Sequence, residues 1–118
     1  MLGLENEMKL FQAVTHSDGF PIRVRAYLYG PLLASGVKGV KPNDGDDRLR
    51  FVGIKFVSDG STQGLTAALN QPYDYPKGTQ SRGNLDYKDE EIYQQMKPLF
   101  DQGWQIATHA NGDRTIEQ

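Results

Sequence analysis

Apolar residues follow two different periods in the first half of this chain. Over residues 4–15 they recur at helical intervals with Glu, Lys and Gln between them, which predicts an amphipathic helix. Residues 22–29 instead alternate apolar with polar or amphipathic side chains, as a strand does. A short helix can start at residues 32–34. Residues 50–57 then form a second strand, which is apolar on both faces apart from Lys55.

A long polar connection separates this strand from the next helix. Residues 58–87 are rich in Gly, Thr, Gln, Asn, Pro and Tyr, and such a connection inside a compact domain is usually either functional or disordered. The following helix is predicted to begin at residue 86 or 87, with acidic residues in its first turn that suit the helix dipole. Pro98 should kink or shorten this helix, and Gly103 is suited to end it.

The order of these elements indicates the fold class. Residues 104–109 form a third predicted strand, and Asp113 is the predicted N-cap of a helix over residues 114–118. Strands that alternate with helices imply βα units, so the predicted class is α/β with about three parallel strands and intervening helices. So short a final helix is not stable alone. We therefore expect residues 1–118 to be a single segment of a larger domain, a barrel, truncated at both ends.

Charge and composition exclude several classes of function. The chain has 13 Lys and Arg against 15 Asp and Glu, scattered along the sequence, so nothing favours a nucleic acid or an anionic membrane as partner. The absence of cysteine excludes disulfides and thiolate metal sites. No apolar run approaches the ~20 residues that span a bilayer. The N-terminus lacks the features of a signal peptide, and the compartment stays open.

Lys55 is the first candidate for chemistry. Simple alternation places it on one face with Phe51, Gly53 and Val57, and the glycine opens space beside the lysine. Burial of an unpaired ammonium is costly, so this residue needs a partner, a neutral state or a modification. One interpretation is a lysine that pairs with a neighbouring strand's carboxylate or reaches out of an exposed face. The other is a functional group: a Schiff base, a general base or a metal-bridging carbamate.

His109 is the second candidate, because it ends a strand just before an Asn-Gly turn, where α/β folds place their ligands. It is either a core histidine bonded to the backbone or a metal ligand. Asp59 follows the second strand and is either a turn residue or part of a site. Asp59 and Asp113 can also be read as the paired carboxylates of a glycosidase. His16, in a polar loop, is predicted to be inert.

Several of these segments resemble one known family when they are taken in order. They are Gly53–Ser61, Thr66–Leu69, Pro72-Tyr73, Gly83–Leu85 and Gly103–Arg114. Over roughly residues 20–118 they look like the central part of amidohydrolase family 3, whose members are metal-dependent hydrolases of the amidohydrolase superfamily. The resemblance implies a partial (β/α)8 TIM barrel, with metal ions at the C-terminal ends of the strands.

The resemblance also assigns roles to particular residues. Lys55 matches a strand-four lysine that can be carbamylated and bridge two metals, and His109 matches a strand-five histidine ligand. Asp59 is the implied catalytic residue. Substrate-binding positions above the metals would be Gly60, Thr66 and Tyr73.

The implied cofactor is a divalent metal, with zinc as the expected ion. One or two ions would be bound in the full-length parent and none in this segment. The family's His-x-His pair, strand-six histidine and strand-eight aspartate are missing here, and the only histidines are His16 and His109. The implied substrate is a small molecule with an amide-type C–N bond, hydrolysed by a metal-activated water. The isolated chain is expected to be inactive.

A different class of function competes with this one. The chain can instead be a non-catalytic binding or interaction module derived from a hydrolase barrel. Such a module would fold cooperatively as 118 residues and bind a ligand or partner without metal. A truncated parallel sheet leaves strand edges and apolar faces uncovered, so we also expect self-association of the segment.

Overall fold

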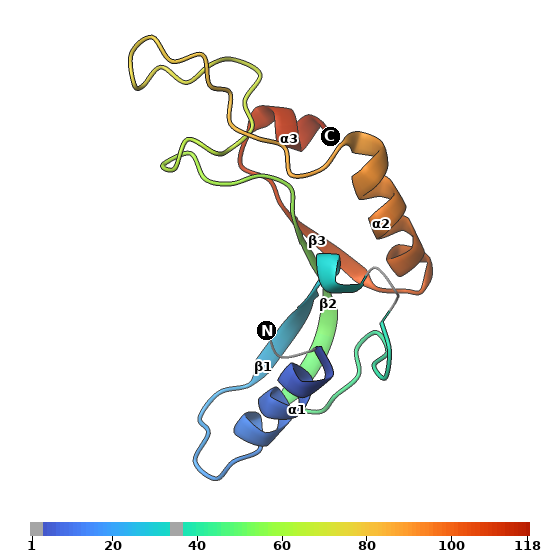
Figure 1. The fold of residues 1–118 in the computed structure, drawn as a ribbon. Coiled ribbons are helices and arrows are strands. Elements are labelled where there is room, and N and C mark those ends of the chain that lie inside the picture. The colour runs from blue at the N-terminus through green and yellow to red at the C-terminus, as the bar shows by residue number, and fades with distance from the viewer. Residues whose placement is uncertain (1–3, 34–36) are drawn as a thin grey trace.

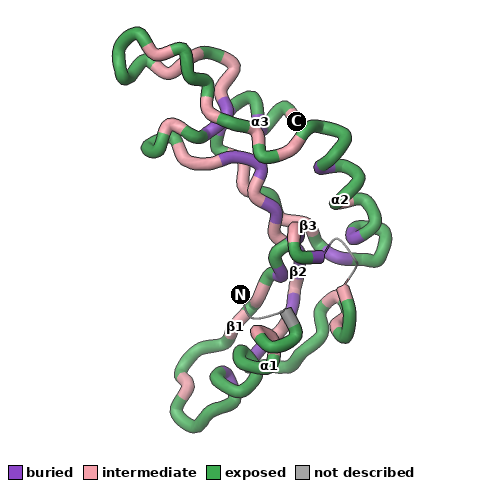
Figure 2. The backbone as a smooth tube through the Cα atoms, viewed as in Figure 1, coloured by how far each residue is buried: buried purple, intermediate pink, exposed green. Residues whose placement is uncertain are grey.

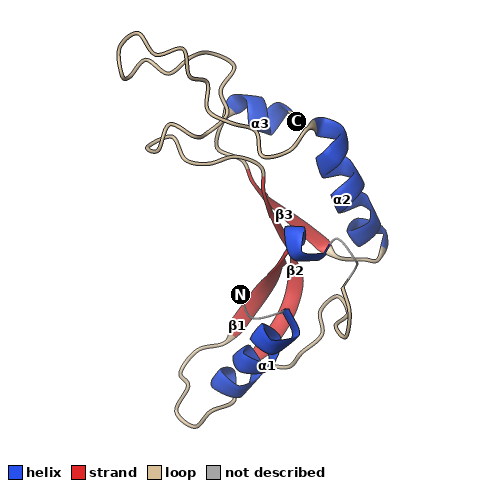
Figure 3. Cartoon of the chain, in the orientation of Figure 1, coloured by secondary structure: helices blue, strands red, loops and turns tan. Residues whose placement is uncertain are grey.

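The computed structural model describes residues 4–33 and 37–118, and its strands form one parallel sheet in the order β1-β2-β3 (Figures 1 and 3). The strands are β1 (Val24–Tyr29), β2 (Leu49–Val57) and β3 (Gln105–His109). The helices of the described residues are α1 (Leu4–Thr15), the 3-10 helix η1 (Gly30–Leu33), α2 (Asp89–Asp101) and α3 (Asp113–Glu117). The predicted α/β class with three parallel strands is confirmed. Of the short helix predicted at residues 32–34, Ala34 lies outside the described residues.

The first helix packs less closely than its apolar spacing predicts. Met8 lies against the core, whereas Phe11 is 51% and Val14 is 45% exposed. The helix ends at Thr15, whose buried hydroxyl donates back to the carbonyl of Phe11 at 2.8 Å. The prediction of α1 is therefore confirmed in its bounds and only partly in its buried face.

Strand β2 carries one residue more than its neighbour β1 over the paired region. Ala26 pairs with Phe51, but the next residue, Tyr27, pairs with Gly53. Val52 therefore has no counterpart in β1, which makes it the extra residue of a β-bulge. Because the side chains of a strand alternate between faces, this bulge reverses the alternation along β2.

The bulge changes which side chains of β2 share a face. Phe51 turns to the helix-covered face, whereas Gly53 and Lys55 lie on the other. The prediction that Phe51 shares a face with Lys55 is therefore wrong. A single hydrophobic core forms on the helix-covered side, and its buried members are Leu28, Leu33, Leu49, Phe51, Ile54, Phe56, Leu99 and Trp104.

The start of α2 differs from the prediction. The helix begins at Asp89, later than predicted, and the carboxylate of Glu91 accepts the N–H of the preceding Lys88 at 3.0 Å. Pro98 lies inside the helix, which continues to Asp101, and a kink at this residue stays a prediction. Neither this helix nor any other in the described residues is long and apolar enough to cross a membrane.

The end of α2 directs the chain into the core. The N–H of Trp104 donates to the carbonyl of Leu99 at 3.1 Å, and that of Gly103 to Phe100 at 2.9 Å, which is the Schellman arrangement. Gly103 adopts a φ of 88°, as this ending requires. Leu99 and Trp104 are both buried. The turn that stops the helix therefore also starts the packing of β3.

The connection after β2 has two parts at the carboxyl end of the sheet. Ala67 and Ala68 are buried at its base (Figure 2). Residues 69–82 then form an arm that projects away from the sheet (Figure 1). The arm is closed by a hydrogen bond of 2.8 Å from the N–H of Leu69 to the carbonyl of Arg82. The base, rather than the arm, is the part that lies over the strand ends.

The last helix begins one residue earlier than predicted. Gly112 is the N-cap of α3, and Asp113 is the first helical residue. The carboxylate of Asp113 accepts the N–H groups of Arg114 and Asn70, each at 2.9 Å. The prediction of Asp113 as the N-cap is therefore wrong by one position, and its side chain instead ties α3 to the arm.

Candidate functional site

The sheet face that turns away from the core carries the candidate chemistry. Its side chains lie in three rungs, which are Tyr27, Gly53 and Gln105, then Tyr29, Lys55 and Ala107, and finally Val57 and His109. None of these residues belongs to the hydrophobic core of the described chain. Tyr27 is 41% and Tyr29 is 46% exposed, so this face is open to solvent at β1.

Lys55 and His109 lie on this open face on neighbouring strands. Lys55 pairs with Ala107, and Val57 pairs with His109, so the lysine and the histidine are diagonal neighbours. Standard strand spacing and rise put their Cα atoms roughly 8 Å apart. This juxtaposition agrees with the shared site that the family resemblance implies, and it allows one ion or one substrate to contact both side chains.

Lys55 is half-buried, and within the described part of the chain no carboxylate pairs with it. Its neighbours on the same rung are Tyr29 and Ala107, neither of which supplies a carboxylate. The interpretation in which an adjacent strand supplies a carboxylate therefore does not apply to these strands. The amine remains available to a group that comes from elsewhere.

The space over Gly53 is filled by Tyr27 and is not open to the lysine as predicted. A Cβ atom at Gly53 would come within 2.8 Å of two ring carbons of Tyr27. The amide of Gln105 donates to the hydroxyl of Tyr27 at 3.0 Å, so the tyrosine ring spans the rung from β1 to β3. The glycine is needed because the tyrosine ring lies across β2 at this point.

The position of one proton on His109 follows from its contacts. Nε2 lies 2.8 Å from the carbonyl oxygen of Gly60, and the side-chain amide of Asn111 donates to the same oxygen at 2.9 Å. The amide nitrogen of Asn111 also lies 3.1 Å from Nε2, but its hydrogen is directed to the carbonyl of Gly60. Because a carbonyl only accepts, the shorter contact of Nε2 with that oxygen assigns a proton to Nε2, and the lone pair of the neutral ring lies at Nδ1. The ring is half-buried, with 36% of the side chain exposed.

Asp59 lies at the centre of the carboxyl-end loops and is fully buried. Its carboxylate accepts four hydrogen bonds of 2.7 to 3.0 Å, from the backbone N–H groups of Ala68, Asn111 and Gly112 and from the hydroxyl of Thr115. Burial raises the pKa of this carboxyl group, but the four hydrogen bonds outweigh burial, and the pKa lies below its usual value. Asp59 is therefore an ionised, buried hydrogen-bond acceptor.

The residues predicted to bind substrate are engaged with the loop itself. Gly60 donates its N–H to the carbonyl of Thr66 at 3.3 Å, and the hydroxyl of Thr66 accepts the N–H of Ser61 at 2.9 Å. The hydroxyl of Tyr73 donates to the carbonyl of Ala67 at 2.8 Å. These contacts shape the base of the connection after β2, and contact with a substrate stays a prediction.

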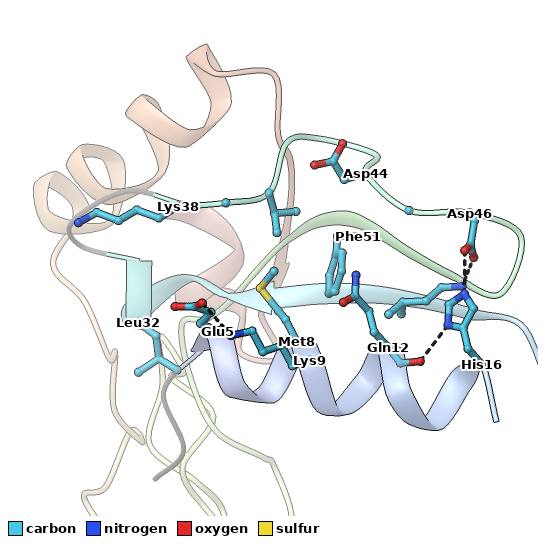
Figure 4. Close-up of a pocket in the computed structure, with 14 residues that line it drawn as sticks. Glu5, Met8, Lys9, Gln12, His16, Leu32, Lys38, Asp44, Asp46 and Phe51 are labelled. Atoms are coloured by element: carbon cyan, nitrogen blue, oxygen red, sulfur yellow. Dashed lines mark hydrogen bonds and ion pairs between the residues drawn. The ribbon is translucent and has the colours of Figure 1, made fainter.

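A cavity of about 750 Å³ lies on the helix-covered side, between α1 and residues 38–46 (Figure 4). Met8, Leu49 and Phe51 contribute its apolar wall. Lys55, Asp59 and His109 do not line it, so this cavity is separate from the candidate site.

His16 joins α1 to the loop that closes this cavity (Figure 4), and its lack of a chemical role stays a prediction. Its Nε2 lies 2.7 Å from Oδ2 of Asp46, and its Nδ1 lies 2.8 Å from the carbonyl of Gln12. Both bonds raise the pKa of His16, the first more strongly. The same contact with His16, together with hydrogen bonds from the backbone N–H groups of Leu49 and Arg48, lowers the pKa of Asp46 to about 2. Sequence reasoning missed this pair because its partners are 30 residues apart.

Metal binding requires more than the described residues supply. Across residues 4–33 and 37–118, no three His, Asp or Glu side chains converge in a way that could hold an ion. Lys55 and His109 are therefore at most part of a ligand set, and further donors would have to join them on the open face.

Comparisons with known proteins agree with the fold. A family model described as "Amidohydrolase family" matches residues 2–118. An uncharacterized metal-dependent hydrolase from Pyrococcus horikoshii OT3 has a TM-score of 0.76 at 25% identity, over 93% of this chain and 22% of its own. An uncharacterized metal-dependent hydrolase from Pyrococcus furiosus has a TM-score of 0.73 at 29% identity, over 97% of this chain and 23% of its own. The chain thus spans less than a quarter of the length of these solved hydrolases. Among curated proteins, no similar sequence was found.

Proposed function

The chain belongs to the amidohydrolase family, and on that premise we propose that it supplies three neighbouring strands of a metal-dependent hydrolase barrel that cleaves an amide-type C–N bond. Lys55 and His109 are two of the metal ligands in this proposal. The observation that carries it is their common position on the open face of neighbouring parallel strands, close to the strand ends. That is where barrels of this architecture hold their catalytic groups.

His109 has the hydrogen bonding of a metal ligand. A ligating imidazole normally donates its second ring N–H to a carbonyl or carboxylate, which fixes the ring and its tautomer. Here the Nε2–H of His109 donates to the carbonyl of Gly60 at 2.8 Å. Nδ1 is then the nitrogen with a free lone pair, so it is the proposed metal-binding atom.

Lys55 fits a metal site only in a changed chemical form. An ammonium has no lone pair, so it does not ligate a cation. Addition of carbon dioxide to the neutral amine, with loss of one proton, would produce a carbamate anion whose oxygens are suitable ligands for divalent metals, and the metal charge would in turn stabilise that anion. The absence of a carboxylate partner on the described strands leaves this lysine available for such a modification.

The proposed ion is divalent, with zinc favoured by the imidazole donor and by oxygen donors such as a carbamate. When bound, such an ion supplies a water of low pKa and polarises a carbonyl group. The other ligands would come from strands that these residues do not include. Gly60, Thr66 and Tyr73 would form the wall of a pocket for a small amide-type substrate, through the loop that their own hydrogen bonds shape.

The test is the metal content and amide hydrolysis of the hydrolase that carries this segment, with Lys55 replaced by Ala. We expect metal affinity and rate to fall by more than ~100-fold, since removal of a ligand should exceed the effect of removing an outer partner. The matched control is Lys41→Ala, in an exposed loop. Unchanged metal content and rate in Lys55→Ala would refute the ligand role. Binding of a ligand or partner without metal would instead favour the non-catalytic module.

A further inference from the structure

Two loops meet at the carboxyl end of the sheet, and one carboxylate joins them. Asp59 opens the connection that follows β2, and residues 110–112 connect β3 to α3. Oδ2 of Asp59 accepts the N–H of Ala68 at 3.0 Å and that of Gly112 at 2.7 Å. A Cβ atom at Gly112 would collide with the backbone of Ala68, so the loops touch backbone to backbone here.

The burial of Asp59 favours a role in holding the two loops together over a role in exchanging protons with a substrate. An ionised carboxylate only accepts, and its two oxygens can serve all four donors that surround it. The side chain is 0% exposed. A substrate could reach it only by displacing both loops. A neutral side chain of the same shape would have a single acceptor oxygen and would leave donors unpaired.

A second set of bonds connects Asp59 to His109. The N–H of Asn111 donates to Oδ1 of Asp59 at 3.0 Å, and the side-chain amide of Asn111 donates to the carbonyl of Gly60 at 2.9 Å. That carbonyl accepts the Nε2–H of His109. Gly60 also follows Asp59 directly in the chain. The acceptor for the histidine is thus held from both sides by contacts that begin at Asp59.

We propose that Asp59 is a positioning residue for His109. Its carboxylate holds Asn111 and, through it, the carbonyl of Gly60, so that the imidazole keeps its proton on Nε2 and its lone pair on Nδ1. The metal-binding use of Nδ1 rests on the function proposed above. The positioning itself does not, because every hydrogen bond in it joins residues of this chain. The direct catalytic role expected for Asp59 is replaced in this proposal by an indirect one.

The test is NMR of the imidazole groups in the metal-free chain at about pH 8, where an ordinary histidine is neutral. The chain has two histidines, so His16 provides an internal reference in the same spectrum. The unaltered chain should show a slowly exchanging Nε2–H at His109. In Asp59→Asn this signal should be lost and the two tautomers of His109 should mix, while the His16 signal stays unchanged. Asn111→Ala should have the same effect in a weaker form.

The control variant is Thr115→Val, which removes one hydrogen bond of the same carboxylate without touching the path to His109. Its His109 signal should be retained. The proposal is overturned if His109 keeps its Nε2–H in either Asp59→Asn or Asn111→Ala, or if Thr115→Val loses it equally. Should Asp59→Asn not fold, which loss of the His16 signal reports, Asn111→Ala decides alone. Failure of the hydrolase proposal leaves this metal-free result untouched.

Discussion

The two faces of the sheet differ in role: one buries the hydrophobic core, and the other exposes the candidate functional side chains. On the helix-covered face, Leu49, Ile54 and Phe56 are at most 1% exposed. On the other face, Tyr27 and Tyr29 are more than two-fifths exposed. Alternating positions of the same strands thus serve different purposes. Stability depends on one set and the candidate chemistry on the other, so each can be altered with little effect on its counterpart.

The open face also explains why the fold accepts Lys55. An ammonium that keeps part of its water is not heavily penalised, whereas the same group sealed in an apolar interior needs a compensating charge or a neutral form. Lys55 is half-buried in the described chain. A covering layer over this face would raise the cost of the lysine, and carbamylation with metal binding is one way to remove that cost.

The largest expected effect separates the two faces directly. Phe56→Ala removes a fully buried ring from the core and should lower the free energy of unfolding by ~3–5 kcal/mol. Tyr29→Ala, on the open face, should cost less than ~1 kcal/mol. Urea unfolding followed by circular dichroism measures both. Equal losses would show that the faces do not differ in the way described.

Acid should act next most strongly, through Asp59 at the strand ends. Its folded-state pKa lies below the unfolded value of about 3.9, so its contribution to stability is complete above that pH and is lost as the pH falls through the folded pKa. Asp59→Asn should cost ~1–3 kcal/mol at neutral pH and flatten the acid dependence. Unfolding midpoints across this pH range measure the effect, with the exposed Asp74→Asn as control. An unchanged acid dependence in Asp59→Asn would contradict the assignment.

Lys55→Met should change stability by less than ~0.5 kcal/mol, although it removes the proposed metal ligand. The reason is that no described carboxylate pairs with the ammonium of Lys55, so its removal leaves no carboxylate without a partner. Denaturant unfolding of the variant beside the unaltered chain provides the measurement. A loss comparable to that of Phe56→Ala would mean that Lys55 supports the fold.

The smallest expected effect concerns the exposed pair on the helix-covered side. The pKa of His16 is raised by its bond to Asp46, so this pair contributes fully below about pH 6.5 and its contribution is lost as the pH rises through the folded value. Asp46→Asn should therefore lower the melting temperature slightly in mild acid and leave it unchanged in mild alkali. The reverse dependence would be incompatible with the contact.

Some features of the fold were accessible from the sequence because local periodicity encodes them. The shared site of Lys55 and His109 was implied by the family resemblance, whereas the alternation of strands and helices followed from counting along the chain. The bulge at Val52 did not, because residues on both sides of β2 are apolar and give no alternation to interrupt. The N-cap at Gly112 differed from the prediction because the carboxylate of Asp113 turns to Asn70, which is 43 residues away.

The candidate site was less accessible because its contacts involve the backbone. Three of the four donors to Asp59 are main-chain N–H groups. Every non-proline residue has such a group, so the amino-acid sequence does not indicate which residues donate to Asp59. The same holds for the carbonyl of Gly60 that fixes His109. Side-chain chemistry indicated which residues matter, whereas their roles depended on how distant loops approach one another.

The additional residue in β2 also has an evolutionary consequence. It divides the strand into two stretches, and the alternation of side chains between the two sheet faces starts anew in the second stretch. Lys55 belongs to this second stretch. An insertion or deletion upstream of Gly53 can be absorbed where the phase already breaks, without rotating the lysine. The same change between Gly53 and Lys55 would swing the amine into the helix layer. Relatives are thus expected to vary in length before this glycine and to keep a constant spacing after it.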